Sequence, residues 1–141
     1  MAEWFACAVA AALLYGLHQV FTKLAAPHIG DGLGGFTVEA SATLTIGLYL
    51  AVLWLSGSRQ QKVSPPGFVY SVLTGVCVGL GTIAFFLLFQ KGGPLSAVPM
   101  VLALGAAVMA LVGIVWFKEP ASPGRVLGIT LSIVGLFLLR K

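Results

Sequence analysis

Long, uninterrupted runs of apolar residues dominate the chain, and their length predicts membrane-spanning helices. Each run has roughly 17 to 24 nearly uncharged residues, and about 20 residues of helix cross the hydrocarbon core of a bilayer. The runs are continuously apolar and lack the alternation of polar and apolar residues that marks the strands of a β-barrel. The sequence therefore predicts an all-α membrane protein with five transmembrane helices, at about residues 4–22, 36–55, 67–90, 95–117 and 124–139.

Short connectors separate these runs and leave no room for a soluble domain, so we expect one domain over residues 1–141. The connector 25–35 is rich in glycine, the connector 56–66 is the most polar, and the turn at 91–94 is very short. Pro99 lies in the first turns of the fourth run, where we expect it to remove a backbone hydrogen bond of the helix.

The composition supports the same class and excludes others. Hydrophobic residues make up 59% of the chain and charged residues only 9%, against about 25% charged in a typical soluble domain. This excludes a water-soluble enzyme, a nucleic-acid-binding module and a disulfide-stapled secreted domain. The first run lacks the basic region of a signal peptide, so we expect it to be a retained span. Cys7 and Cys77 lie in apolar runs at depths that differ by roughly 9 Å, and we expect two unpaired core cysteines.

The basic residues are divided evenly between the two sides of the membrane. Five crossings place the termini on opposite sides, and each side then collects four Lys or Arg residues. The side of the N-terminus has Arg59, Lys62, Lys118 and Arg125, and the other side has Lys23, Lys91, Arg140 and Lys141. Because an excess of Lys and Arg normally marks the cytoplasmic side, the sequence does not choose an orientation. Either other determinants decide it, or the chain inserts both ways and two opposed copies pair.

Small residues at four-residue spacing predict close contacts between helices. The third run carries Ser71, Gly75 and Gly79, and the fifth run carries Gly124 and Gly128. Small residues allow two helix backbones to approach closely, and packing drives helix association in lipid. The sequence does not indicate whether these contacts lie within one subunit or between subunits.

Polar residues inside the spans gather mainly in the half of the membrane opposite the N-terminus and predict a substrate site there. A polar side chain within a span needs a partner, a water-filled cavity or a functional role. The first four runs all contribute to this half, and only Tyr15 lies nearer to mid-depth. We predict one polar vestibule per subunit, with a substrate site formed by Tyr15, His18, Gln19, Glu39, Thr82, Ser96 and Pro99.

Two of these residues are candidates for chemistry, and each has a structural alternative. Glu39 is the only acidic residue within a span, and an intramembrane carboxylate is a candidate for coupling to a proton or cation. The alternative is a structural pair with Lys23, which ends the first span at a similar depth. His18 is a candidate for binding a substrate anion or a proton, and its alternative is a hydrogen-bonded core histidine. The sequence has no Cys/His cluster with metal-ligand spacing and no Ser-His-acid set at one depth, so we predict no metal site, no cofactor and no enzyme activity.

Several motifs in the chain resemble those of a known family. Residues 93–99 read Gly-Pro-Leu-Ser-Ala-Val-Pro, residues 116–120 read Trp-Phe-Lys-Glu-Pro, and residues 128–135 read Gly-Ile-Thr-Leu-Ser-Ile-Val-Gly. With Tyr15 and the glycine after it, this pattern resembles the EamA domain of the drug/metabolite transporter superfamily in its five-span form. Lys118 stands where glycine is common before the glutamate, and Tyr15 stands where tryptophan is more usual.

The resemblance implies the fold and function of a transporter. Most relatives have ten spans, built from two five-span units in opposite orientation, and move amino acids, metabolites or drugs. This chain resembles one such unit standing alone, one half of an inverted-repeat fold in the inner (plasma) membrane. We therefore expect an alternating-access transporter of small-molecule substrates that works in the lipid bilayer as an antiparallel, dual-topology homodimer and binds no nucleic acid.

Two other functions stay open. One is a subunit of a heteromeric transporter or of a lipid-linked sugar flippase, and the other is a membrane scaffold that transports nothing. The resemblance also implies a limit. Four-span exporters of the same superfamily rely on a glutamate in their first span, where this chain has no acid, so proton antiport does not carry over.

Overall fold

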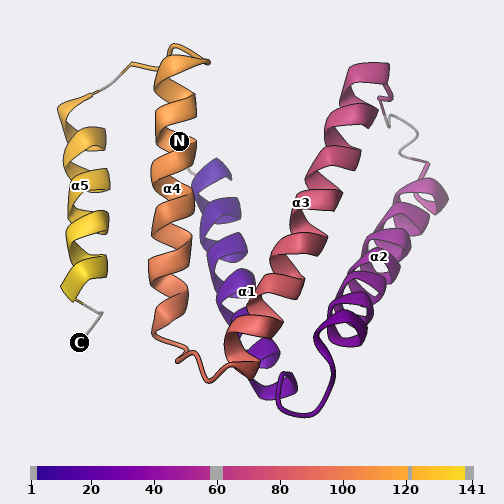
Figure 1. Ribbon diagram of the computed structural model, residues 1–141. Helices are drawn as coiled ribbons and strands as arrows, with labels where there is room; N and C mark the ends of the chain where they lie inside the picture. The colour runs from indigo at the N-terminus through magenta and orange to yellow at the C-terminus, as the bar shows by residue number, and fades with distance from the viewer. Residues whose placement is uncertain (1–2, 58–61, 121, 139–141) are drawn as a thin grey trace. The chain divides into compact units, whose positions relative to one another are not determined.

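The described part of the chain forms five α-helices. The computed structural model describes residues 3–57, 62–120 and 122–138, and these ranges contain no β-strand. The helices are α1 (Glu3–Ala25), α2 (Asp31–Leu55), α3 (Pro65–Gln90), α4 (Ala97–Val115) and α5 (Pro123–Leu138) (Figure 1). The prediction of an all-α protein is confirmed, and each helix overlaps the predicted run of residues.

Four of the helices are long and apolar enough to cross a membrane: Trp4–Ala25, Asp31–Leu55, Pro65–Gln90 and Ala97–Val115. Helix α5 has 16 residues, which gives a length of about 24 Å at 1.5 Å per residue. That is shorter than the hydrocarbon core of a bilayer, about 30 Å. The protein is therefore a multi-pass membrane protein, and the predicted fifth crossing stays a prediction.

The chain divides into two compact units, residues 1–92 with α1 to α3 and residues 93–141 with α4 and α5. In the first unit α3 packs against both α2 and α1, and in the second unit α4 packs against α5. The single domain over 1–141 stays a prediction.

The packed part of the first unit lies at one end, where α1 ends, α2 begins and α3 ends (Figure 1). The buried residues all lie near this end: Gln19, Thr22, Ala26, Gly34, Gly35, Thr82, Phe86 and Phe89. Toward the other end, residues 4–17, 41–52 and 65–78 are all exposed. In a membrane these apolar surfaces face lipid or other helices.

Glycine sets the distance between α2 and α3 at the packed end. A Cβ atom added at Gly34 would lie 2.5 Å from Cε1 of Phe86, and one added at Gly35 would lie 3.2 Å from Cγ1 of Ile83. Phe86 is only 1% exposed. The absence of a side chain at Gly34 therefore lets the ring of Phe86 lie against the backbone of α2.

Among the described residues, the glycines of the predicted stripes have open space where a side chain would stand. A Cβ atom added at Gly75, Gly79, Gly124 or Gly128 would meet nothing within 4 Å. The contact between α2 and α3 uses Gly34 and Gly35 instead, so the stripe in α3 does not identify the contact inside the unit. Contacts of these residues between subunits stay a prediction.

The helix ends account for the cap at Ser64, the position of Pro99 and the backbone conformation of Lys118. The side chain of Ser64 accepts a hydrogen bond from the N–H of Gly67 at 3.3 Å and caps α3. Pro99 is the third residue of α4, so its missing N–H is among the first four, which have no partner in the helix. The expected loss of a hydrogen bond at Pro99 is therefore wrong. After α4, Lys118 has a φ of 51°, a conformation that favours glycine.

The cysteines were predicted correctly in one respect and wrongly in another. Cys7 and Cys77 are both free, as expected, but both are exposed and not buried in the core. The reason is that α1 and α3 pack only near the end far from Cys7, so the faces that carry the two thiols have no helix against them within the first unit.

Candidate functional site

Four of the predicted site residues lie at similar distances from the packed end of the first unit, counted along their helices. His18 and Gln19 come from α1, Glu39 from α2 and Thr82 from α3. Gln19 is six residues from the end of α1, Glu39 is eight residues after the start of α2, and Thr82 is eight residues before the end of α3. At 1.5 Å per residue, these positions lie roughly 9 to 12 Å inside the packed end. This set of four residues is called the polar layer below.

A hydrogen bond joins α2 and α3 within the polar layer. The hydroxyl of Thr82 donates to Oε1 of Glu39 at 2.6 Å, and the carbonyl of Val78 lies at 3.0 Å from the same hydroxyl. Thr82 is 5% exposed. Hydrogen bonds to a charged acceptor are short and strong, so the bond to Glu39 is the favoured one. Sequence analysis placed both residues in the site but did not predict that they bond to each other.

The α1 side of the layer carries polar atoms that lack partners. Nδ1 of His18 and Oε1 of Gln19 are buried and have no hydrogen-bond partner among the described residues, and Gln19 is 6% exposed. A buried polar atom without a partner costs about 1–3 kcal/mol. An arrangement of this kind fits a site whose ligand or bound water completes the hydrogen bonds.

Tyr15 borders the layer from the side of the membrane centre. Its ring meets that of His18 edge to face, with centroids 6.4 Å apart and an interplanar angle of 73°. Tyr15 itself is 66% exposed. Tyr15 and His18 therefore lie on one face of α1, and the role of both in substrate binding stays a prediction.

Lys23 lies one turn beyond the layer toward the packed end. Its Nζ atom is 5.1 Å from the centroid of the Phe89 ring, a cation–π contact between α1 and α3. The hydrogen bond of Glu39 described above goes to Thr82. The alternative in which Lys23 and Glu39 form a structural pair stays a prediction.

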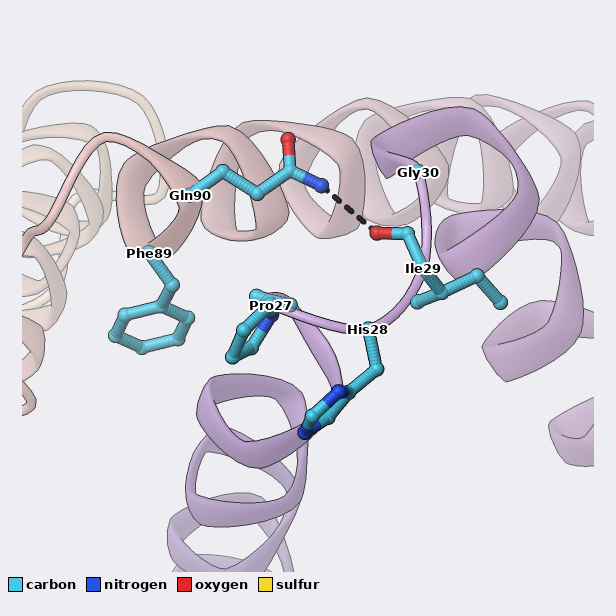
Figure 2. A pocket seen from close by; sticks show the side chains of 7 residues that line it. Pro27, His28, Ile29, Gly30, Phe89 and Gln90 are labelled. Carbon is cyan, nitrogen blue, oxygen red and sulfur yellow. Dashed lines mark hydrogen bonds between the residues drawn. The ribbon is translucent and has the colours of Figure 1, made fainter.

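An open pocket of about 490 Å³ lies at the same end of the first unit, where the connector from α1 to α2 passes the end of α3. Figure 2 shows the side chains around it, with Nε2 of Gln90 donating to the carbonyl of Ile29 at 2.9 Å. The residues that line it are Ala26, Pro27, His28, Ile29, Gly30, Phe89 and Gln90. The pocket was not predicted. Pro27 and Gly30 indicate a turn in this connector. The sequence gives no sign that the turn and Gln90 together line a pocket.

Ser96 and Pro99 belong to the second unit. Both are exposed, and Ser96 precedes α4 without a capping hydrogen bond from its side chain. Their place in the substrate site stays a prediction. In the described part of the chain, no group of three or more His, Cys, Asp or Glu residues could hold a metal ion.

Comparisons with known proteins give one family and one curated relative. The model of the EamA-like transporter family matches residues 3–141. The chain is 43% identical over 65 residues to a protein of Pseudomonas savastanoi pv. phaseolicola described as probable 4-amino-4-deoxy-L-arabinose-phosphoundecaprenol flippase subunit ArnE. The aligned segment covers 46% of this chain and 56% of that protein, so the chain spans only about half the length of this relative. No solved structure matches the chain.

Proposed function

The chain belongs to the EamA-like transporter family, and from this premise we propose that it supplies one half of an alternating-access transporter for a polar solute. The observation that carries the proposal is the polar layer, which lies near one end of the first unit and holds buried atoms without partners. A second unit in the opposite orientation would bring an equivalent layer near the other membrane face. That arrangement is the one through which inverted units expose a site to each side in turn.

We infer further that the solute is a lipid-linked sugar and that the protein acts in the inner (plasma) membrane. The support is the 43% identity to a flippase subunit whose name describes such a substrate. A flippase moves a sugar head group across the hydrocarbon core, where it loses water. A layer of polar side chains at that depth would replace the lost hydrogen bonds.

The second unit has two candidate sources. A different chain is favoured by the relative, which is described as a subunit. An inverted copy of the same chain is favoured by the division of Lys and Arg residues, four on each side for five crossings, because no excess then fixes one orientation. Of these eight residues, Arg59, Arg140 and Lys141 lie outside the residues that the structure describes.

The test is reconstitution of the purified protein in liposomes that contain a polyprenyl-phosphate-linked amino sugar in one leaflet. Movement of the sugar is followed by its accessibility to a membrane-impermeant reagent. Movement by the protein alone would support the homodimer, and movement only after a related small subunit is added would support the heteromer. The absence of movement with both, in liposomes where the protein is folded, would refute the flippase function.

Orientation can be tested separately in cells. Two lysines inserted next to Gly32 should fix one orientation of the chain. If the homodimer is correct, the fixed variant works only beside a copy fixed the other way. A fixed variant that works unaided would contradict dual insertion and leave the heteromer.

A further inference from the structure

The unused hydrogen-bonding capacity of the polar layer indicates which chemical group it binds. We propose that the layer formed by His18, Gln19, Glu39 and Thr82 binds the ammonium group of an amine-bearing head group. This inference rests on the proposed function, because it names the part of the transported solute that the layer recognises.

The first step of the argument is a count of donors and acceptors. An ionised carboxylate only accepts hydrogen bonds and has room for about four, and Glu39 accepts one from Thr82. Oε1 of Gln19 is a buried acceptor without a partner. Nδ1 of His18 is also an acceptor when the ring proton is on Nε2. The hydroxyl proton of Thr82 is already used, and the other donors of the layer are the amide N–H groups of Gln19 and the ring N–H of His18.

The second step concerns the ligand that such a set of atoms prefers. A primary ammonium group has three donors and no acceptor, so it suits acceptors such as the carboxylate of Glu39 and Oε1 of Gln19. A hydroxyl group brings one proton and no charge, and an acylated amine brings one proton and a bulky carbonyl. A phosphate would place its negative charge against the carboxylate of Glu39. The layer therefore favours a cationic amine over each of these groups.

The third step concerns the position of Lys23, the cationic side chain of α1 nearest to the layer. The amine of Lys23 lies over the ring of Phe89, and Phe89 is seven residues after Thr82 in α3. Seven residues of helix correspond to about 10 Å, so the ring that this ammonium contacts belongs to a residue nearer the packed end than Thr82. The carboxylate of Glu39 is the charge that the layer itself contributes.

The test compares head groups that differ at one position. Farnesyl phosphate linked to glucosamine, to N-acetylglucosamine or to glucose is titrated into the full-length protein in nanodiscs of phosphatidylcholine, and each Kd is measured by calorimetry. Phosphatidylcholine carries no primary amine that would compete. We expect the glucosamine probe to bind about tenfold more tightly than the other two, as for a charged hydrogen bond.

Two variants locate the effect, and a third serves as the control. Glu39→Gln keeps an acceptor for Thr82 but removes the charge, and it should bring the preference for the amine close to one. Gln19→Leu should weaken amine binding severalfold while the melting temperature stays equal or rises, because it removes a buried acceptor without a partner. Glu119→Gln removes a carboxylate beyond the end of α4 and should leave the preference unchanged.

The outcomes distinguish failure of the amine-binding inference from failure of the proposed function. A wild-type protein that binds the three probes equally would overturn the inference, and so would a preference that survives in both Glu39→Gln and Gln19→Leu. Amine-selective binding without flipping in the liposome assay would refute the proposed function alone. Flipping of the glucose and glucosamine probes at equal rates, with equal affinity, would refute the inference alone.

Discussion

The contact between Gly34 and Phe86 permits a quantitative test of the fold. Replacing Gly34 with alanine places a methyl carbon where the ring of Phe86 now lies, 2.5 Å from its Cε1 atom and 2.7 Å from its Cζ atom. These distances are far below van der Waals contact. The ring is 1% exposed, so it has little space into which it can turn, and α2 must move away from α3.

The expected magnitude follows from two opposing terms. Adding a methyl group to a packed site costs about 1–3 kcal/mol, and exchanging glycine for alanine within a helix stabilises it by about 0.8–1.0 kcal/mol. Gly47 of α2 offers a matched control, because a Cβ atom added there meets nothing within 4 Å. The stabilising term is shared by both variants, so Gly34→Ala should be about 1–3 kcal/mol less stable than Gly47→Ala.

The free energy of unfolding can be measured in mixed micelles by titration with sodium dodecyl sulfate, with helix content as the signal. A smaller side chain at the partner position should restore stability, so Phe86→Leu should be less harmful in the Gly34→Ala background than in the wild type. Equal stability of the Gly34→Ala and Gly47→Ala proteins would refute the close packing of α2 on α3 at this point.

Three further substitutions test separate features. Thr82→Val should destabilise the protein by about 1.5–3 kcal/mol through loss of the bond to Glu39. The control Thr74→Val loses only a bond to its own helix and should change the free energy of unfolding much less. Equal effects of the two substitutions would contradict the stabilising role of the bond between Thr82 and Glu39. Lys118→Gly should stabilise the second unit by about 1 kcal/mol, because glycine adopts a φ of 51° without strain, and a drop in thermal stability would argue against that conformation. Gln90→Leu should remove a bond to the connector between α1 and α2 worth about 0.5–1.5 kcal/mol, seen as faster hydrogen exchange of the connector amides; unchanged exchange would show that the bond is not needed.

The helices could be predicted from the sequence because length and hydropathy determine them locally. Each of the five predicted runs overlaps a helix. Helix α2 is longer than predicted, Asp31–Leu55 against 36–55, whereas α4 is shorter, Ala97–Val115 against 95–117. The extension of α2 has a simple reason. Its first turn is rich in glycine and holds Asp31, so it does not look apolar, but an acid at a helix N-terminus is favourable.

The packing between helices could not be predicted in the same way. Glycines occur in every run, and a small residue indicates only that a close approach is allowed. A Cβ atom added at Gly75 or Gly79 of α3 would meet nothing within 4 Å despite the ideal spacing, whereas one added at Gly34 would meet the ring of Phe86. Which glycine is used depends on the bulky residue opposite it, and that residue is known only once the two helices are aligned.

The site was predictable in its depth but not in its bonds. The sequence placed Gln19, Glu39 and Thr82 in the same half of the membrane, and the structure brings Glu39 and Thr82 into contact. The sequence offered Lys23 as the partner of Glu39 because opposite charges at one depth attract. The structure shows the hydrogen bond from Thr82 to Glu39 and the ammonium of Lys23 over the ring of Phe89, and the pair of Lys23 with Glu39 stays a prediction.

The packing contact and the polar layer are parts of one arrangement. Phe86 lies one turn after Thr82 in α3, and Glu39 lies just over one turn after Gly34 in α2. The close approach at Gly34 therefore sets the distance across which Thr82 donates to Glu39, and a side chain at Gly34 should lengthen that bond. The double variant should then lose less free energy of unfolding than the sum of the losses in Gly34→Ala and Thr82→Val alone. The reason is that the first substitution already weakens the bond that the second removes. Strict additivity would mean that the layer holds its geometry independently of the glycine, and that the helix contact and the site are separate features of the unit.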